Sequence, residues 1–234
     1  MRASHRLQSP AFILHRRDYG ESSRILSCFT REYGRVDMVC KGCRKSGKAS
    51  KVLEPFRCYT LSWTGKSDLK TLVHVDENQV HAIHHDSHKL YCGLYLNELL
   101  HGLIRALESE PDLFELYENT LHRLAEDQGS SIKYILRYFE LNMLSHMGYG
   151  VSLEYEQDGV TPINADTHYG FQPEHGFFRT DARQQFLARG DSIIALNTGR
   201  LQSARQELEA RNLTRLLIGY YLPDTKIQSR KLFV

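Results

Sequence analysis

The residues with the clearest chemical use are cations crowded into one short stretch. Six lysines and arginines fall within seventeen residues, opposed only by Asp37. The middle of this stretch, 41–48, is polar and rich in glycine, which indicates a loop between strands. Such a loop can lie along a phosphate backbone, because each contact releases condensed counterions. The alternative is a solvated loop without a specific ligand. The six cations are Arg35, Lys41, Arg44, Lys45, Lys48 and Lys51.

Further arginines and several aromatic residues lie near this run. Aromatic rings beside cations can stack on bases for about 1–3 kcal/mol per base, although in a small barrel such rings more often fill the core. Tyr33 and Tyr59 are the better stacking candidates, because a hydroxyl tolerates a half-exposed site. The arginines that widen the predicted nucleic-acid surface are Arg16, Arg17, Arg24 and Arg57, and the aromatic residues are Phe29, Tyr33, Phe56, Tyr59 and Trp63.

Two groups of residues have spacings that metal sites use. Cys40 and Cys43 form a CxxC pair, which can supply two zinc ligands or a redox pair, but no second pair follows to complete a tetrahedral zinc site. Five cysteines, an odd number, favour free thiols in a reducing compartment. The histidine group is more typical of a solvated linker than of a metal site, and we predict no metal. Its members are His81, His84, His85 and His88.

The motifs of common enzyme active sites are absent from the sequence. We find no nucleophile elbow, no zinc-hydrolase helix and no dinucleotide fingerprint. The stretch 42–48 approaches a phosphate loop but lacks its GK[ST] ending. A hydrolase with dispersed catalytic residues remains an alternative. The sequence favours a binding protein with no catalytic residues and no cofactor.

The distribution of charge supports a polyanionic partner for the first part of the chain. The net charge is +2, but residues 1–70 hold fifteen lysines and arginines against six acidic residues. Residues 71–234 hold fifteen against twenty-two. Opposed charges of +9 and −7 indicate that the two parts have different partners.

The elements that would position these cations are short strands. Alternating or apolar runs at 11–14, 23–30, 34–39, 56–63 and 69–75 are separated by turn residues. Five short strands predict a small barrel, and the OB-fold is the five-stranded barrel that binds oligonucleotides. We therefore predict an OB-fold domain over residues 1–80.

The pattern changes to helical spacing after residue 80. Apolar residues recur at helical intervals over 88–107, from 111 onward and over 131–147. Two more helices are expected at 199–211 and 212–222, with a loop-rich insertion at about 148–190 that holds at most a short hairpin. The predicted fold class is α+β, with a mostly helical domain over 81–234.

An ordered series of motifs resembles the RecO family, the recombination mediators of bacteria. The series covers nearly the whole chain, from AFILHRRDYGESSRIL at 11–26 and VCKGCR at 39–44 to LYLNELL at 94–100, RYFEL at 137–141 with GYG at 148–150, and SRKLF at 229–233. Many members carry a four-cysteine zinc site in the helical domain. Residues 148–180 contain no cysteine, so this chain resembles a zinc-free branch.

The resemblance implies a cytoplasmic, nucleoid-associated protein that binds single- and double-stranded DNA and anneals complementary strands. It also implies work with RecR to load RecA onto DNA coated by single-strand-binding protein, whose acidic carboxyl-terminal tail docks on the helical domain. Arg137, by its place in the RYFEL motif, is the expected contact for this tail, with Arg123 and Lys133 beside it. The alternative function is an RNA-binding OB-fold module. The sequence does not reveal the oligomeric state.

Overall fold

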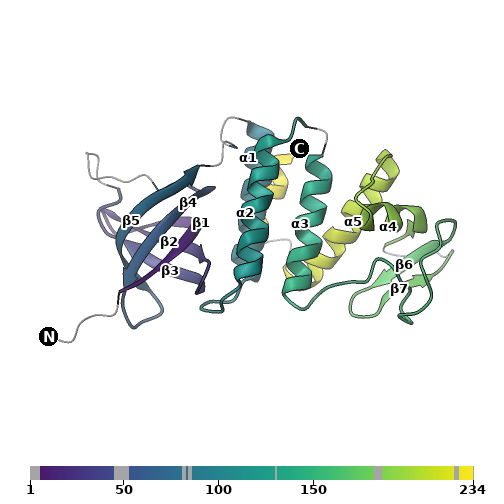
Figure 1. The fold of residues 1–234 in the computed structure, drawn as a ribbon, viewed down its shortest axis with the longest axis horizontal. Coiled ribbons are helices and arrows are strands. Elements are labelled where there is room, and N and C mark those ends of the chain that lie inside the picture. Colours follow the sequence, from purple (N-terminus) through teal and green to yellow (C-terminus); the bar gives the residue numbers. More distant parts are fainter. Residues whose placement is uncertain are drawn as a thin grey trace. The chain divides into compact units, whose positions relative to one another are not determined.

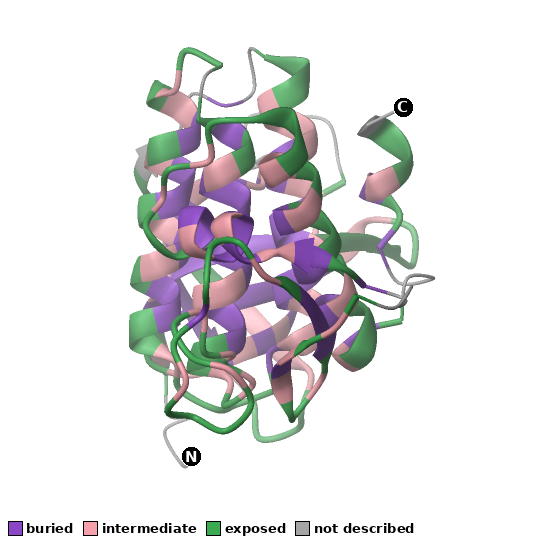
Figure 2. Cartoon of the chain, turned by 90° about the vertical axis from the view of Figure 1, so that its right-hand side faces the viewer, coloured by how far each residue is buried: buried purple, intermediate pink, exposed green. Residues whose placement is uncertain are grey.

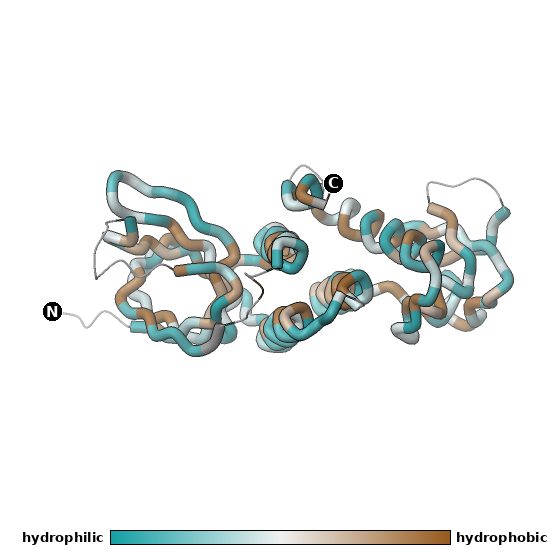
Figure 3. The backbone as a smooth tube through the Cα atoms, turned by 90° about the horizontal axis from the view of Figure 1, so that it is seen from above, coloured by the Kyte–Doolittle hydropathy of each residue, from teal (hydrophilic) through white to brown (hydrophobic). Residues whose placement is uncertain are grey.

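The computed structural model describes residues 6–44, 53–80, 83, 86–129, 131–181, 186–223 and 227–233, and its first part is a closed barrel (Figure 1). The strand order is β1-β2-β3-β5-β4, and Figure 3 shows the strands closing into a ring. β3 and β5 are parallel, and every other pair is antiparallel. This arrangement fits the OB-fold and confirms the predicted fold class. The strands are β1 (Leu7–Tyr19), β2 (Ser23–Thr30), β3 (Gly34–Cys40), β4 (Arg57–Thr64) and β5 (Lys70–Val80).

Alternation along the strands fills the barrel interior. Buried and half-buried positions strictly alternate along β3, as expected for a strand with one face toward a core. Trp63 is buried in that core, and Tyr33 packs edge-on against it with ring centroids 5.3 Å apart. Tyr59 is only 3% exposed, so its ring belongs to the core, which is the more common role of such rings, and it is not available for stacking. Phe29 and Phe56 are also fully buried.

Two helices complete the first compact unit, which spans residues 1–125 and 225–234. These helices are α1 (Ser87–Leu103) and α2 (Pro111–Glu126). The short 3₁₀ helix η3 (Ser229–Phe233), near the end of the chain, belongs to the same unit. Phe12, on the outer face of the barrel, packs against Tyr117 of α2 with ring centroids 5.0 Å apart. Asn97 of α1 donates to the carbonyl oxygens of Ile13 and Leu14, where the β1 ladder shifts register. The boundary between the two compact units falls at the end of α2, between residues 125 and 126. The domain boundary expected near residue 80 stays a prediction.

The second compact unit spans residues 126–224 and contains more regular structure than the sequence predicts. The expected insertion holds a three-stranded sheet in the order β7-β6-β8. The two helices expected at 199–211 and 212–222 are one continuous helix, and a separate helix precedes it. The elements are α3 (Ile132–His146), β6 (His168–Gln172), β7 (Gly176–Arg179), β8 (Ala188–Arg189), α4 (Gly190–Asn197) and α5 (Ala204–Tyr221).

Three helices show the burial pattern of amphipathic helices. Buried positions recur beside exposed ones along α2, α3 and α5, purple and green in Figure 2, whereas α1 has no exposed residue between Lys89 and His101. Tyr169 and Phe177 are completely buried and anchor the small sheet of the second unit. Among the described residues, no helix has the length and apolar character needed to span a membrane.

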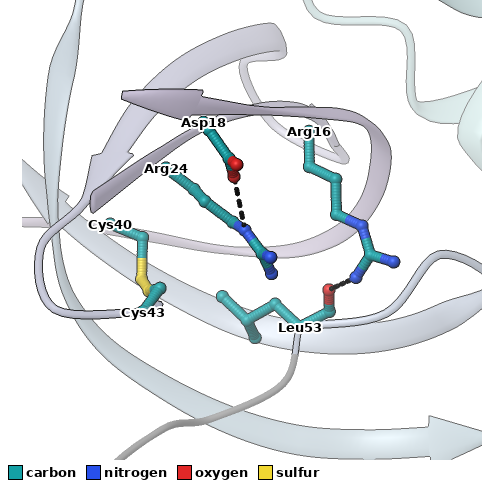
Figure 4. The surroundings of a disulfide bond; sticks show 6 residues. All are labelled: Arg16, Asp18, Arg24, Cys40, Cys43 and Leu53. Carbon is teal, nitrogen blue, oxygen red and sulfur yellow. Dashed lines mark hydrogen bonds and ion pairs between the residues drawn. A yellow bond between two sulfur atoms is a disulfide. The ribbon is translucent and has the colours of Figure 1, made fainter. Parts of the chain in front are cut away.

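The cysteines differ from expectation at one place. Cys40 and Cys43 are joined by a disulfide, so the prediction of five free thiols is wrong for this pair (Figure 4). Gly42 lies between them with a φ of +74°, which turns the chain and leaves the two Cα atoms 5.8 Å apart, within the range of disulfides. Cys28, Cys58 and Cys92 are buried and form no disulfide.

Candidate nucleic-acid interface

The ends of three neighbouring strands gather several of the predicted cations at one mouth of the barrel. Across the antiparallel ladders Asp18 of β1 faces Arg24 of β2, and Arg24 faces Cys40 of β3. Arg16 lies two residues before Asp18, and side chains two residues apart share one face of a strand. Figure 4 shows Arg16, Asp18, Arg24 and the disulfide around this mouth.

One carboxylate serves two guanidinium groups there. Asp18 accepts from Arg24 Nε at 3.2 Å and lies 3.4 Å from Arg44 Nη2. Arg44 Nη1 also donates to the carbonyl oxygen of Gly20 at 2.9 Å, and its backbone N–H donates to that of Ser22. These bonds hold the residue after the disulfide onto the β1–β2 turn. Because two cations share one anion, the cluster keeps excess positive charge.

Further cations extend this surface. Arg16 donates to the carbonyl oxygen of Leu53 at 3.1 Å, and the Leu53 side chain is buried in the barrel core. Lys41 is exposed next to the disulfide, and Arg17 is exposed on the opposite face of β1 from Arg16 and Asp18. Residues 16–24 and 41–44 together carry five cations and two anions, Asp18 and Glu21. We define the basic hairpin patch as Arg16, Arg17, Arg24, Lys41 and Arg44.

Arg35 lies away from the basic hairpin patch. It pairs with Phe29, five residues along β3 from the Arg24–Cys40 pair, which corresponds to about 17 Å of strand. Its Nη1 donates to the carbonyl oxygen of His101 near the carboxyl end of α1 at 2.8 Å. This arginine therefore binds the barrel to a helix.

Arg57 is a second predicted cation that lies outside the basic hairpin patch. Its guanidinium contacts Glu54 at 3.0 Å and Glu77 at 2.5 Å. The hydrogen bond to Glu77 raises the pKa of Arg57 above its usual value. Its charge is balanced by two carboxylates. Three further predicted cations, Lys45, Lys48 and Lys51, lie outside the described residues, as do His81, His84 and His85.

The three cations predicted to bind an acidic peptide tail lie in different environments. Arg137 is 9% exposed and forms a bidentate pair with Glu140, whose two oxygens each accept at 2.5 Å. Lys133 is exposed and lies 2.5 Å from Glu207. Arg123 is exposed on α2, in the first unit. Any acidic peptide at Arg137 must compete with Glu140, and the grouping of these three cations stays a prediction.

Two features of the patch were not predicted from the sequence. Asp18 organises Arg24 and Arg44, although they are 20 residues apart, because the hairpin register brings them together. Tyr19, the next residue, is 52% exposed, whereas Tyr33 is half-buried and Phe29, Phe56, Tyr59 and Trp63 are buried. Its position before Gly20 at the hairpin turn was the available signal. Within the described ranges, no cluster of three or more histidine, cysteine or acidic side chains is placed to hold a metal.

Comparisons with known proteins agree along the whole chain. Residues 1–77 match the family model "Recombination protein O N terminal", and residues 84–231 match "Recombination protein O C terminal". The "DNA repair protein RecO" of Alkalilimnicola ehrlichii is 38% identical over 97% of this chain and 90% of its own. Proteins of the same name from Methylococcus capsulatus and Vibrio cholerae are 33% and 34% identical over 95% of this chain and 91% of theirs.

Proposed function

Because the chain belongs to the RecO family, we propose that it is a DNA repair protein that binds DNA through the basic hairpin patch. The observation that carries this proposal is the cluster of Arg24 and Arg44 around a single carboxylate on an OB-fold barrel. Barrels of this class bind oligonucleotides, and guanidinium groups bind phosphate oxygens through fixed pairs of donors. The proposed role is binding, without a chemical step.

The finer function follows from what charge neutralisation does to two strands. Cations on the patch reduce the repulsion between phosphate backbones and release their counterions. A protein that binds single and double strands in this way favours annealing of complementary strands. We include RecR, RecA and the tail of single-strand-binding protein as partners, since the family resemblance implies loading of RecA onto coated DNA.

Fluorescence anisotropy with labelled oligonucleotides tests the binding site. The variant Arg17→Ala/Lys41→Ala/Arg44→Ala removes three patch cations and should weaken single- and double-stranded DNA binding at least tenfold at low salt. A matched control, Arg200→Ala/Arg211→Ala/Arg215→Ala, removes the same charge from exposed positions of the second unit and should bind DNA as the wild type does. Equal weakening by both variants would reject the patch as the binding site.

The same assay with RNA distinguishes the DNA repair role from the alternative function, an RNA-binding module. Preference for DNA, or equal binding, supports the repair role, whereas strong preference for RNA of the same sequence favours an RNA-binding module. Annealing of complementary strands, followed by energy transfer between end labels, should accelerate with wild-type protein and less with the triple patch variant. If that variant accelerates annealing as much as the wild type does, annealing does not depend on the patch.

A further inference from the structure

Tyr19 is an exposed aromatic residue at the end of β1. Its side chain is 52% exposed. Its ladder partner across the hairpin is Ser23, which is too small to cover an aromatic ring. Among the described residues, Tyr19 takes part in no ring pair and no side-chain hydrogen bond. Folding of the barrel therefore gives no evident reason for an aromatic ring there.

The surroundings of Tyr19 are cationic. The residues before and after it, Asp18 and Gly20, are the two hairpin groups that contact the guanidinium of Arg44. Arg17 lies two residues before Tyr19 on the same face of β1, about 7 Å along the strand. The exposed ring thus shares its face of β1 with the exposed cation Arg17 and adjoins the turn that Arg44 contacts.

This combination is what single strands require. Single-stranded nucleic acids bind where cations follow the backbone and an aromatic side chain stacks on a base. The barrel aromatics Phe29, Phe56 and Tyr59 are buried and cannot stack without unfolding the core. Tyr19 offers an accessible ring on the strand face that carries Arg17.

We propose that Tyr19 is a base-stacking residue that gives the basic hairpin patch its preference for unpaired strands. The proposal rests on the proposed function of the patch. A phosphate bound at Arg17, on the same face of β1, leaves an unpaired base free to lie on the ring. In a duplex the bases are already stacked on one another, so the ring contributes little.

The test compares two single-stranded ligands of equal length, an oligo(dT) and an abasic oligomer with the same phosphates. Wild-type protein should bind oligo(dT) more tightly than the abasic strand. Tyr19→Ala should lose about 5- to 100-fold in oligo(dT) affinity and retain its abasic and duplex affinities, while Tyr19→Phe should behave as wild type. Tyr220→Ala is the control, because Tyr220 is 55% exposed in the second unit.

The outcomes separate this inference from the function on which it rests. If Tyr19→Ala keeps the wild-type ratio of oligo(dT) to abasic affinity, stacking by Tyr19 is rejected while the patch stands. If wild-type protein binds neither strand, the proposed function itself fails. Tyr19→Trp adds an optical readout, since the only native tryptophan, Trp63, is buried. Its fluorescence should be quenched by oligo(dT) and unchanged by the abasic strand; equal quenching by both would contradict stacking.

Discussion

Arg137 and Glu140 form an ion pair that is almost closed to solvent, with side chains 10% and 1% exposed. Removing one member of such a pair leaves an uncompensated buried charge, whereas replacing both with apolar residues is often neutral. The sequence motif identified Arg137 as a surface contact. It gave no sign of the pair, although Glu140 lies one helical turn away at i+3.

Arg137→Ala should lower the free energy of unfolding by about 3–5 kcal/mol, and the double variant Arg137→Met/Glu140→Leu should recover most of that loss. Urea denaturation followed by circular dichroism measures both. Wild-type stability of the single variant would contradict a structural role for the pair. Binding of an acidic peptide to the stable double variant then tests Arg137 as a docking residue without the confusion of unfolding.

Asp86 caps the amino terminus of α1 by accepting from the backbone N–H groups of His88 and Lys89. The bond from Lys89 is the main cause that lowers the pKa of Asp86 below its usual value. A lowered folded-state pKa gives stability that is present above the unfolded-state pKa and lost as pH falls through the folded one. The stability difference between wild type and Asp86→Ala should be constant near neutrality and shrink below about pH 4. A difference independent of pH would exclude the charged cap.

The free thiols should be inert in the native protein. Burial raises the pKa of Cys58 to about 11 and raises that of Cys28 above its usual value. Because the thiolate is the reactive form, iodoacetamide at pH 8 should leave the native protein unlabelled. After mild reduction, mass spectrometry should find label at Cys40 and Cys43 first. Labelling of Cys28 or Cys58 at the same rate would contradict their burial.

At the scale of elements, the barrel strands were predictable and the second unit was less so. Alternating hydrophobicity located all five strands, because each strand has one face toward a core. α4 was missed since its first residues, Gly190 and Asp191, are typical of loops. Asp191 is held instead by Arg205 of α5 at 2.5 Å, and this bond lowers the pKa of the carboxyl. A contact over fourteen residues leaves no local pattern.

Only part of the site could be predicted from the sequence, because contacts between residues distant in the sequence leave no local pattern. Arg24 and Arg44 come together at Asp18 through the pairing of β1, β2 and β3, and the sequence marks these strands clearly. Arg35 belongs to the same basic run but turns to the carbonyl oxygen of His101, 66 residues away. Counts of charge locate a basic region, and long-range contacts decide which of its cations remain available.

The close approach of β3 to the chain after α1 gives a test at this scale. A Cβ at Gly34 would lie 1.8 Å from the backbone oxygen of Glu108, and Gly34 has a φ of +60°. Gly20 has a φ of +61° with open space around it. Gly20→Ala should therefore cost about 1–2 kcal/mol from backbone strain alone, and Gly34→Ala clearly more. Equal losses of unfolding free energy would show that the β3 contact is not tight.

At the scale of the whole molecule, the charge asymmetry of the sequence acquires a location. The net positive charge of residues 1–70 belongs to the part that forms the barrel, and five of those cations make the basic hairpin patch. In the same region, Arg35 donates to a backbone oxygen of α1, and the charge of Arg57 is balanced by two carboxylates. The net charge of this region therefore overstates the number of cations that can meet a phosphate backbone.

The proposal that the basic hairpin patch binds DNA phosphates is tested by the salt dependence of the affinity for single-stranded DNA. The logarithm of the association constant falls linearly with the logarithm of salt concentration, by about 0.7 per neutralised phosphate on a single strand. Loss of Arg17, Lys41 and Arg44 together should reduce this slope by about 2. We expect that smaller slope for the patch variant and an unchanged slope for the control with three arginines removed from the second unit. A patch variant with the wild-type slope would contradict the proposal.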